Sequence, residues 1–243
     1  MNINDLRSLW KQAFGDTDDF LDDFFCVVYS EDRCNTIEKD GNLAAMLYWF
    51  DCLWEGKKVA YLYAVATDEA YRNQGLCRAL MEDTHKKLQA LGYAGAVLVP
   101  GSKELFGLYE KFGYIPFCNR LTITVDAGSE KADFAALSTK EYYSRRLPLL
   151  PAGSIAQDRL TIDFLATFCK LYGGDDYLFC GGLEDDTFYF QEFLGSPGRV
   201  PKILKTLGAE KGILRIPGDT PFAMYLPLDG TTELPNYFDI PLN

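Results

Sequence analysis

Residues 64–80 contain a loop and a helix start whose residue types can bind an anion. They read Ala-Val-Ala-Thr-Asp-Glu-Ala-Tyr-Arg-Asn-Gln-Gly-Leu-Cys-Arg-Ala-Leu. We expect a strand to end near Thr67, a short loop to follow over residues 72–75, and a helix to begin at once. The first N–H groups of a helix have no intrahelical partner, and the helix dipole adds positive charge there. The segment therefore predicts a site for phosphate groups.

Single residues of this loop strengthen that prediction. Gly75 allows a ligand to approach the backbone, and Asn73 tolerates a positive φ better than most residues do. Arg72 or Arg78 can add charge-assisted hydrogen bonds. Taken alone, one glycine in a strand-to-helix loop also fits an ordinary turn between a strand and a helix.

Composition excludes several other classes of function. The chain has 243 residues, a formal net charge of -11 and a single histidine, His85. An acidic surface disfavours nucleic acid as a partner, and one histidine excludes a metal site built from several histidines. The seven cysteines form no Cys-x-x-Cys pair, so we expect reduced thiols, no metal and a cytoplasmic protein. No segment approaches the roughly 20 apolar residues of a membrane span, so no membrane partner is expected.

The elements that must position the loop follow from hydrophobic periodicity and turn residues. The first half reads as a mixed α/β pattern, with Gly92 ending the helix that follows the loop. We expect helices over residues 3–14, 17–29, 75–91 and 103–112, and strands over residues 34–38, 43–54, 58–67, 94–99, 114–117 and 121–125.

Two motifs at this spacing resemble the GNAT superfamily of N-acetyltransferases. The segment Tyr71–Leu80 is similar to the family's Arg/Gln-x-x-Gly-x-Gly/Ala loop, with Arg72 and Gly75 in register. The segment Leu108–Tyr114 reads Leu-Tyr-Glu-Lys-Phe-Gly-Tyr and is similar to the family's Leu-Tyr-Glu-Lys-x-Gly-Phe signature. The resemblance covers roughly residues 3 to 126. It implies the GNAT fold, a mixed sheet of the α/β class.

The resemblance also implies a role for each matching residue. Acetyl-CoA would be the cosubstrate, and the hydroxyl of Tyr109 would protonate the departing thiolate as general acid. The alternative for Tyr109 is a buried aromatic residue on a short amphipathic helix. The end of the strand, with Val65, Ala66 and Thr67, would bind the pantetheine arm. The loop would bind the pyrophosphate through Arg72, Asn73, Gln74, Gly75, Leu76 and Cys77. Ser102, after the next strand, would also contact pantetheine.

The sequence departs from the family pattern at three points. Cys77 stands where the loop usually ends in Gly or Ala; a thiol at a helix N-terminus can be unusually acidic, but we interpret it as a tolerated small residue. Ser102 stands where many members carry Asn. The strand before the loop carries no Asp or Glu to act as general base. Asp51 on a neighbouring strand, a water chain, or an amine that arrives neutral are the alternatives.

Two further features carry charge or a titratable group. The first is a cluster of five aspartates at residues 16, 18, 19, 22 and 23. The cluster fits the N-terminal turn and solvated face of a helix, or else a patch that attracts a cationic substrate. The second is His85, at the edge of the long helix's apolar stripe, where we expect a boundary residue rather than a base.

A sequence pattern of the first half recurs in the second half. Leu88-Gln-Ala-Leu-Gly followed by Ala96-Val-Leu-Val-Pro-Gly is matched by Leu204-Lys-Thr-Leu-Gly followed by Gly212-Ile-Leu-Arg-Ile-Pro-Gly. Coincidence between two common helix–Gly–strand units is one explanation, and a second, smaller GNAT-like unit without cofactor binding is the other. We expect a GNAT domain in residues 1–126, a connector in 127–157 and a degenerate GNAT-like domain in 158–243.

Secondary structure in the second half is also expected from pattern. Ser138 and Glu141 form a capping-box pattern at the start of a short helix. A longer helix is expected over residues 158–171, followed by strands over residues 177–180, 187–194, 212–216 and 222–226.

The function that these observations favour is transfer of an acetyl group from acetyl-CoA to a primary amine of a small molecule. A non-catalytic acyl-CoA-binding regulatory module is one alternative, because no base is evident on the strand. An acetyltransferase for protein or peptide amines is another. The acceptor and the oligomeric state stay open at this point.

Overall fold

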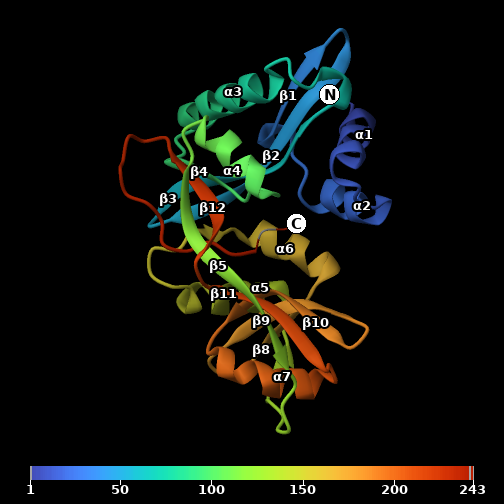
Figure 1. Ribbon diagram of the computed structural model, residues 1–243, viewed down its shortest axis with the longest axis vertical. Helices are drawn as coiled ribbons and strands as arrows, with labels where there is room; N and C mark the ends of the chain where they lie inside the picture. Colours follow the sequence, from blue (N-terminus) through green and yellow to red (C-terminus); the bar gives the residue numbers. More distant parts are fainter. Residues whose placement is uncertain (1, 241, 243) are drawn as a thin grey trace. The chain divides into compact units, whose positions relative to one another are not determined.

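The structure, a computed structural model, describes residues 2–240 and 242 and contains two compact units (Figure 1). Unit 1 combines the residues up to Pro116 with Ala223–Pro235, and unit 2 combines Phe117–Phe222 with the residues from Asn236 onward. These bounds differ from the expected divisions after residues 126 and 157. The reason is that one strand carries the chain out of unit 1 and another strand carries it back.

Unit 1 contains most of the first half of the sequence. Its elements are α1 (Ile3–Phe14), α2 (Asp18–Val27), η1 (Glu31–Arg33), β1 (Cys34–Lys39), β2 (Asn42–Trp54), β3 (Lys57–Thr67), η2 (Glu69–Tyr71), α3 (Leu76–Ala90), β4 (Gly95–Leu98) and α4 (Lys103–Glu110). Each expected helix and strand up to residue 112 is present, with its ends shifted by at most a few residues.

The sheet of unit 1 has the order β1-β2-β3-β4-β12, where β12 spans Thr220–Pro227. β1 pairs antiparallel with β2, and β2 pairs antiparallel with β3. Helix α3 crosses between β3 and β4, which makes that pair parallel, and β12 runs antiparallel to β4. The last strand of the chain therefore completes the sheet that the first half begins.

The two helices that precede the sheet begin and end at capping residues. Asn2 accepts a hydrogen bond from the Asn4 N–H at the start of α1, and Thr17 accepts one from the Phe20 N–H at the start of α2. Gly15 ends α1 in the left-handed conformation that glycine adopts without steric cost. These caps leave only a short connection, so the two helices form a hairpin.

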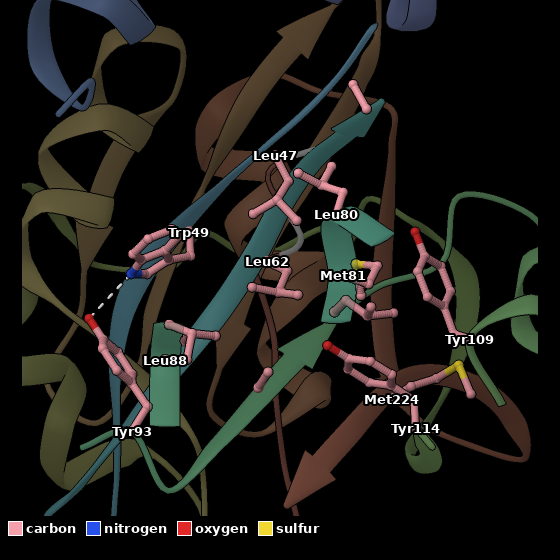
Figure 2. Packing of buried hydrophobic residues seen from close by; sticks show 14 residues of the cluster. Leu47, Trp49, Leu62, Leu80, Met81, Leu88, Tyr93, Tyr109, Tyr114 and Met224 are labelled. Carbon is pink, nitrogen blue, oxygen red and sulfur yellow. Dashed lines mark hydrogen bonds between the residues drawn. The ribbon is translucent and has the colours of Figure 1, made fainter. Parts of the chain in front are cut away.

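One face of the unit 1 sheet packs against α3 and α4 in a continuous hydrophobic cluster (Figure 2). Leu47, Leu62, Leu80 and Leu88 are fully or almost fully buried there. Burial of leucine side chains stabilises the fold by about 1.5–3 kcal/mol each. This cluster fixes α3, and therefore the loop before it, against strand β3.

Unit 2 contains the second half of the sequence and strand β5. Its elements are β5 (Ile115–Asp126), β6 (Ala135–Ala136), α5 (Thr139–Arg146), η3 (Leu147–Leu149), β7 (Ala156–Gln157), α6 (Arg159–Phe168), β8 (Lys170–Gly173), β9 (Leu178–Glu184), β10 (Thr187–Leu194), η4 (Pro197–Arg199), α7 (Val200–Leu207), β11 (Lys211–Pro217) and the start of β12. The capping box of Ser138 and Glu141 is present at the start of α5.

The sheet of unit 2 repeats the succession of unit 1. Its order is β6-β8-β9-β10-β11-β5, with α7 crossing between the parallel strands β10 and β11. β9 and β10 are antiparallel, and β11 is antiparallel to β5. The recurring sequence pattern therefore corresponds to the same strand–strand–helix–strand topology in both units, and the protein has an α/β fold with a second, smaller GNAT-like unit.

The observed elements differ from the expected ones in two places. The helix expected to reach residue 171 ends at Phe168, and Cys169 is extended because β8 pairs with β9 immediately afterwards. The two strands expected over residues 114–125 form one strand, β5, that continues through Cys118 although the φ of that residue is 55°. In both cases pairing with a distant strand decides the structure.

Among residues 2–240 and 242, every helix is too short or too polar to cross a membrane.

The exchange of β5 and β12 between units predicts the behaviour of a truncated chain. A fragment of residues 1–126 lacks β12, whose Met224 and Tyr225 are fully buried and which covers the edge of β4. We expect this fragment to expose apolar surface and a free strand edge, and therefore to aggregate. Size-exclusion chromatography of the fragment beside the full chain tests this. A monomeric and stably folded fragment would show that β12 is dispensable for unit 1.

Candidate cofactor and active site

Strand β3 extends well past the end of its parallel partner. The aligned residues of β3 and β4 run from Val59 to Tyr61, where Tyr61 faces Val97, and β4 ends at Leu98. β3 continues to Thr67. Val65 and Ala66 lie past the end of β4 and have no ladder partner there, and the Thr67 carbonyl beyond them accepts a hydrogen bond from the exposed Arg72 side chain. This part of the strand edge can therefore bind an extended ligand.

A β-bulge lies in β3 where that free edge begins. Tyr63 pairs with Tyr48 and Ala66 pairs with Met46, so β3 has one more residue than β2 over this interval. Ala64 takes up the extra length with a φ of 50°. A bulge bends its strand, and a left-handed alanine costs of order 1–3 kcal/mol unless its surroundings impose it. The expected pantetheine-binding residues, Val65 and Ala66, follow this bend directly.

The loop after β3 leads into an open helix N-terminus. Gly75 is the N-cap of α3 with a φ of 79°, and it provides no side-chain cap. The first amide with an intrahelical bond is that of Ala79, which donates to the Gly75 carbonyl at 3.0 Å. The N–H groups of Leu76, Cys77 and Arg78 therefore precede the helical hydrogen-bond ladder. A Cβ on Gly75 would meet no atom within 4 Å, so this end of the helix is open.

Cationic side chains surround the loop. Arg72 is exposed, pairs with Glu69 at 3.3 Å and donates to the Thr67 carbonyl. Arg78 is also exposed and pairs with Glu82 at 3.6 Å. Exposed ion pairs stabilise a fold by at most about 1 kcal/mol, so both guanidinium groups can exchange these partners for a phosphate.

Two residues at the turn complete the loop. Lys39 at the end of β1 donates a hydrogen bond to the side chain of Gln74, which brings a third cation to the loop. The sequence motif gave no signal for Lys39, because strand pairing alone places it there. Asn73 has a φ of 60° and forms the turn, as its tolerance of positive φ predicts.

Tyr109 lies on α4 and belongs to the hydrophobic cluster of unit 1. Its ring is 7% exposed, in the same hydrophobic cluster that Val65, Leu76 and Cys77 contact. Figure 2 shows its hydroxyl directed away from Tyr114. Burial, and secondarily the electrostatic interaction with Cys77, raises the pKa of Tyr109 above its ordinary value of 10.0, so the phenol stays protonated at neutral pH.

Cys77 does not have the acidic thiol that its place at a helix N-terminus permits. Burial raises the pKa of the Cys77 thiol, and the nearby charge of Arg78 opposes this shift without reversing it. A protonated thiol is a poor nucleophile. The structure therefore agrees with a small packing residue at this position.

Two other expected residues lie beside the site. Ser102 is exposed at the N-cap of α4, where its side chain hydrogen-bonds Glu104 and lowers the pKa of that carboxyl. His85 on α3 is 2.9 Å from the Tyr114 hydroxyl, and burial lowers the pKa of His85 to about 4. His85 is thus neutral at physiological pH and packs at the edge of the cluster, as expected for a boundary residue.

Asp51 lies away from the loop. It pairs with Ala60 on β3, whereas the loop begins after Thr67 at the far end of that strand. Its carboxylate accepts a hydrogen bond from the Tyr93 hydroxyl and pairs with Arg33 at 3.4 Å. These partners give Asp51 a structural role in unit 1. Within residues 2–240 and 242, no cluster of His, Cys, Asp and Glu has the arrangement of a metal site.

Comparison with known proteins identifies this arrangement. Residues 2–117 match the family model of an acetyltransferase (GNAT) domain. No curated protein matches the chain at significant similarity. Among solved structures, a GCN5-related N-acetyltransferase from Anabaena variabilis has a TM-score of 0.73 at 16% identity, over 93% of this chain and 70% of its own.

Two other solved structures are similar over nearly the whole chain. A putative acetyltransferase from Pyrococcus horikoshii has a TM-score of 0.65 at 15% identity, over 98% of this chain and 89% of its own. Eis1 from Mycobacterium abscessus has a TM-score of 0.66 at 12% identity, over 92% of this chain and 70% of its own. At these identities the likeness shows the fold.

The family match spans the strand, the loop and both helices that form the site described above. Residues 2–117 are a GNAT acetyltransferase domain, so the protein contains an acyltransferase domain of a family that generally uses acetyl-CoA.

Proposed function

We propose that the protein transfers the acetyl group of acetyl-CoA to the primary amine of a small molecule. The observation that carries this proposal is the edge of β3 over Val65, Ala66 and Thr67, which extends past the end of β4 and leads directly to the open N-terminus of α3. An extended amide-containing arm can hydrogen-bond to such an edge as a further strand would. Its phosphate end would then lie at the helix N-terminus.

The residues present fit each part of the ligand. The backbone of Val65, Ala66 and Thr67 would bind the pantetheine arm along β3. The loop and first helical turn would bind the pyrophosphate; these residues are Arg72, Asn73, Gln74, Gly75, Leu76 and Cys77. Ser102, exposed at the start of α4, would reach pantetheine from the other side.

The chain contributes polarisation and a hydrogen-bond donor to the reaction. Bound acetyl-CoA supplies a thioester carbonyl and a thiolate leaving group. Amide N–H groups of the free β3 edge would polarise that carbonyl. The protonated hydroxyl of Tyr109 would donate to the sulfur as its charge develops. Because Asp51 is engaged by Tyr93 and Arg33, we propose that the acceptor loses its proton to water before it attacks.

Gly75→Glu tests the phosphate end of the site. The substitution places a side chain and a negative charge in the open space at the start of α3, so we expect acetyl-CoA to bind at least tenfold more weakly, about 1.4 kcal/mol. Gly92→Glu is the matched control, because Gly92 also has a φ of 79° and open space around it but lies at the other end of the helix. Titration calorimetry with both folded variants measures the difference, and equal affinities would remove this loop from the site.

Tyr109→Phe tests whether the Tyr109 hydroxyl donates to the leaving sulfur. The ring packing stays and the hydroxyl is lost, so we expect kcat to fall by roughly 10²-fold while cofactor affinity changes little. Tyr114→Phe is the control, because it removes another buried hydroxyl, one that bonds His85. In the wild type, the raised pKa of Tyr109 means that its ionisation should not lower kcat below pH 10. A Tyr109→Phe enzyme with wild-type turnover would leave Tyr109 as a packing residue.

In unit 2, the strand edge that corresponds to the proposed pantetheine site of β3 is partly occupied by the protein itself. β10 pairs with β11 from Thr187 to Tyr189 and then continues with a register shift, as β3 does. There, however, the Arg215 guanidinium donates to the Gln191 carbonyl at 2.6 Å, and Asp239 lies 3.5 Å from the same guanidinium. Arg215, held by Asp239, thus occupies a carbonyl of the edge that a ligand would need.

The helix of unit 2 is also a weaker anion site. α7 has eight residues, and Pro201 in its first turn has no N–H to donate. We therefore expect calorimetry on the full chain to give one acetyl-CoA per chain. A stoichiometry of two would show that unit 2 retains a cofactor site.

A further inference from the structure

The turn between β1 and β2 brings two side chains to the loop that precedes α3. Asp40 and Gly41 form this turn with φ values of 53° and 78°. Two consecutive residues with positive φ are typical of a tight two-residue hairpin. The strand residues on either side of the turn, Lys39 and Asn42, pair directly with each other. Backbone pairing therefore fixes the positions from which both side chains extend.

Both side chains contact the loop. The Asn42 amide donates a hydrogen bond to the Tyr71 hydroxyl at 3.2 Å. The Lys39 ammonium donates to the side-chain oxygen of Gln74, and the amide N–H of Gln74 donates to the Ala70 carbonyl at 3.3 Å. The side chain of Gln74 is thus held at both its oxygen and its nitrogen. This arrangement keeps the Lys39 ammonium beside the loop, although Lys39 belongs to a different strand.

Lys39 differs from the two arginines of the site in its partner. Arg72 and Arg78 each form an ion pair with a glutamate nearby in the chain. Among the residues that the structure describes, Lys39 forms no ion pair with an Asp or Glu, and its partner Gln74 is neutral. An ammonium has three N–H donors, and the Gln74 oxygen accepts one of them. Lys39 is also partly exposed, so its remaining donors can reach a ligand.

The proposed cosubstrate carries phosphate in two places. A diphosphate joins the pantetheine arm to the adenosine, and a phosphate monoester is attached to the 3′ position of the ribose. The N–H groups at the start of α3 suit the diphosphate. The monoester carries a charge of about −1.5 to −2 at neutral pH, so it favours a cation of its own. Lys39 contacts the outside of the loop and is the cation that the loop motif does not include.

We propose that Lys39 binds the 3′-phosphate of the cosubstrate, so that the protein distinguishes CoA from 3′-dephospho-CoA. The proposal rests on the proposed function, which places the diphosphate at the start of α3. Lysine binds phosphate as a compact point charge and does not require one fixed geometry. Because Gln74 already holds the ammonium at the loop, a ligand would not have to order a free lysine side chain.

Titration calorimetry with CoA and 3′-dephospho-CoA tests this role, because the two ligands differ only in that phosphate. We expect the wild type to bind CoA about tenfold more tightly than 3′-dephospho-CoA. Lys39→Met should remove most of this preference by weakening CoA alone. Lys39→Arg keeps a positive charge at the same position and should retain the preference.

Two comparisons separate a phosphate contact from other effects of the substitution. Lys86→Met removes the same charge from an exposed position of α3 beyond its first turns, and it should bind both ligands as the wild type does. Lys39→Met also loses the bond to Gln74, and a merely structural change of the loop would weaken both ligands equally. Equal weakening of both ligands, or equal effects of Lys39→Met and Lys86→Met, would overturn the proposal.

The wild-type titrations also distinguish this proposal from the proposed function. If the wild type binds neither CoA nor 3′-dephospho-CoA, the cofactor site is wrong and the role of Lys39 is wrong with it. If it binds both ligands with the same affinity, the role of Lys39 is wrong while the proposed function stands.

Discussion

A strand that extends past its neighbour leaves backbone hydrogen-bonding groups without partners, and this constraint governs both units. Such groups cannot stay buried without a partner, because an unpaired one costs about as much as a lost hydrogen bond. In unit 2 the protein supplies the partner, since Arg215 donates to the Gln191 carbonyl. In unit 1, β3 continues to Thr67 after β4 has ended, and its edge leads to the open N-terminus of α3. Both edges carry an arginine that donates to a carbonyl, but Arg215 in unit 2 is partly buried whereas Arg72 in unit 1 is exposed and bonds only the last residue of β3.

The exchange of strands explains why neither half of the sequence corresponds to a complete unit. β12 follows β11 of unit 2 in the sequence, yet it pairs with β4 and buries Met224 in the core of unit 1. β5 leaves unit 1 and pairs with β11. Each sheet is therefore completed by a strand that the opposite half of the chain provides. Pairing over such sequence separations makes the stability of the acetyltransferase domain depend on residues far outside the family's own motifs.

The sequence was sufficient to predict those parts of the site that depend on local physics. The loop, the start of α3 after Gly75 and the place of Tyr109 on a short helix follow from residues near one another in the chain. Features that depend on pairing between strands far apart in the sequence could not be predicted from local residues. Nothing near Ala64 signals its left-handed φ, which the register of β2 against β3 imposes, and Lys39 comes to the loop through β1. The end of α6 at Phe168 likewise depends on the pairing of β8 with β9.

The net charge of the protein makes the local field decisive for the proposed cofactor site. An overall charge of -11 repels a phosphate-bearing cosubstrate, so the α3 N-terminus, with Arg72, Arg78 and Lys39 near it, would have to overcome that repulsion at short range. Alternation along β3 places different helices on its two faces, because Leu62 faces the cluster under α3 while Tyr63 faces Trp10 and α1. The strand whose edge is proposed to bind the cofactor is thus supported by α3 on one face and by the α1–α2 hairpin on the other.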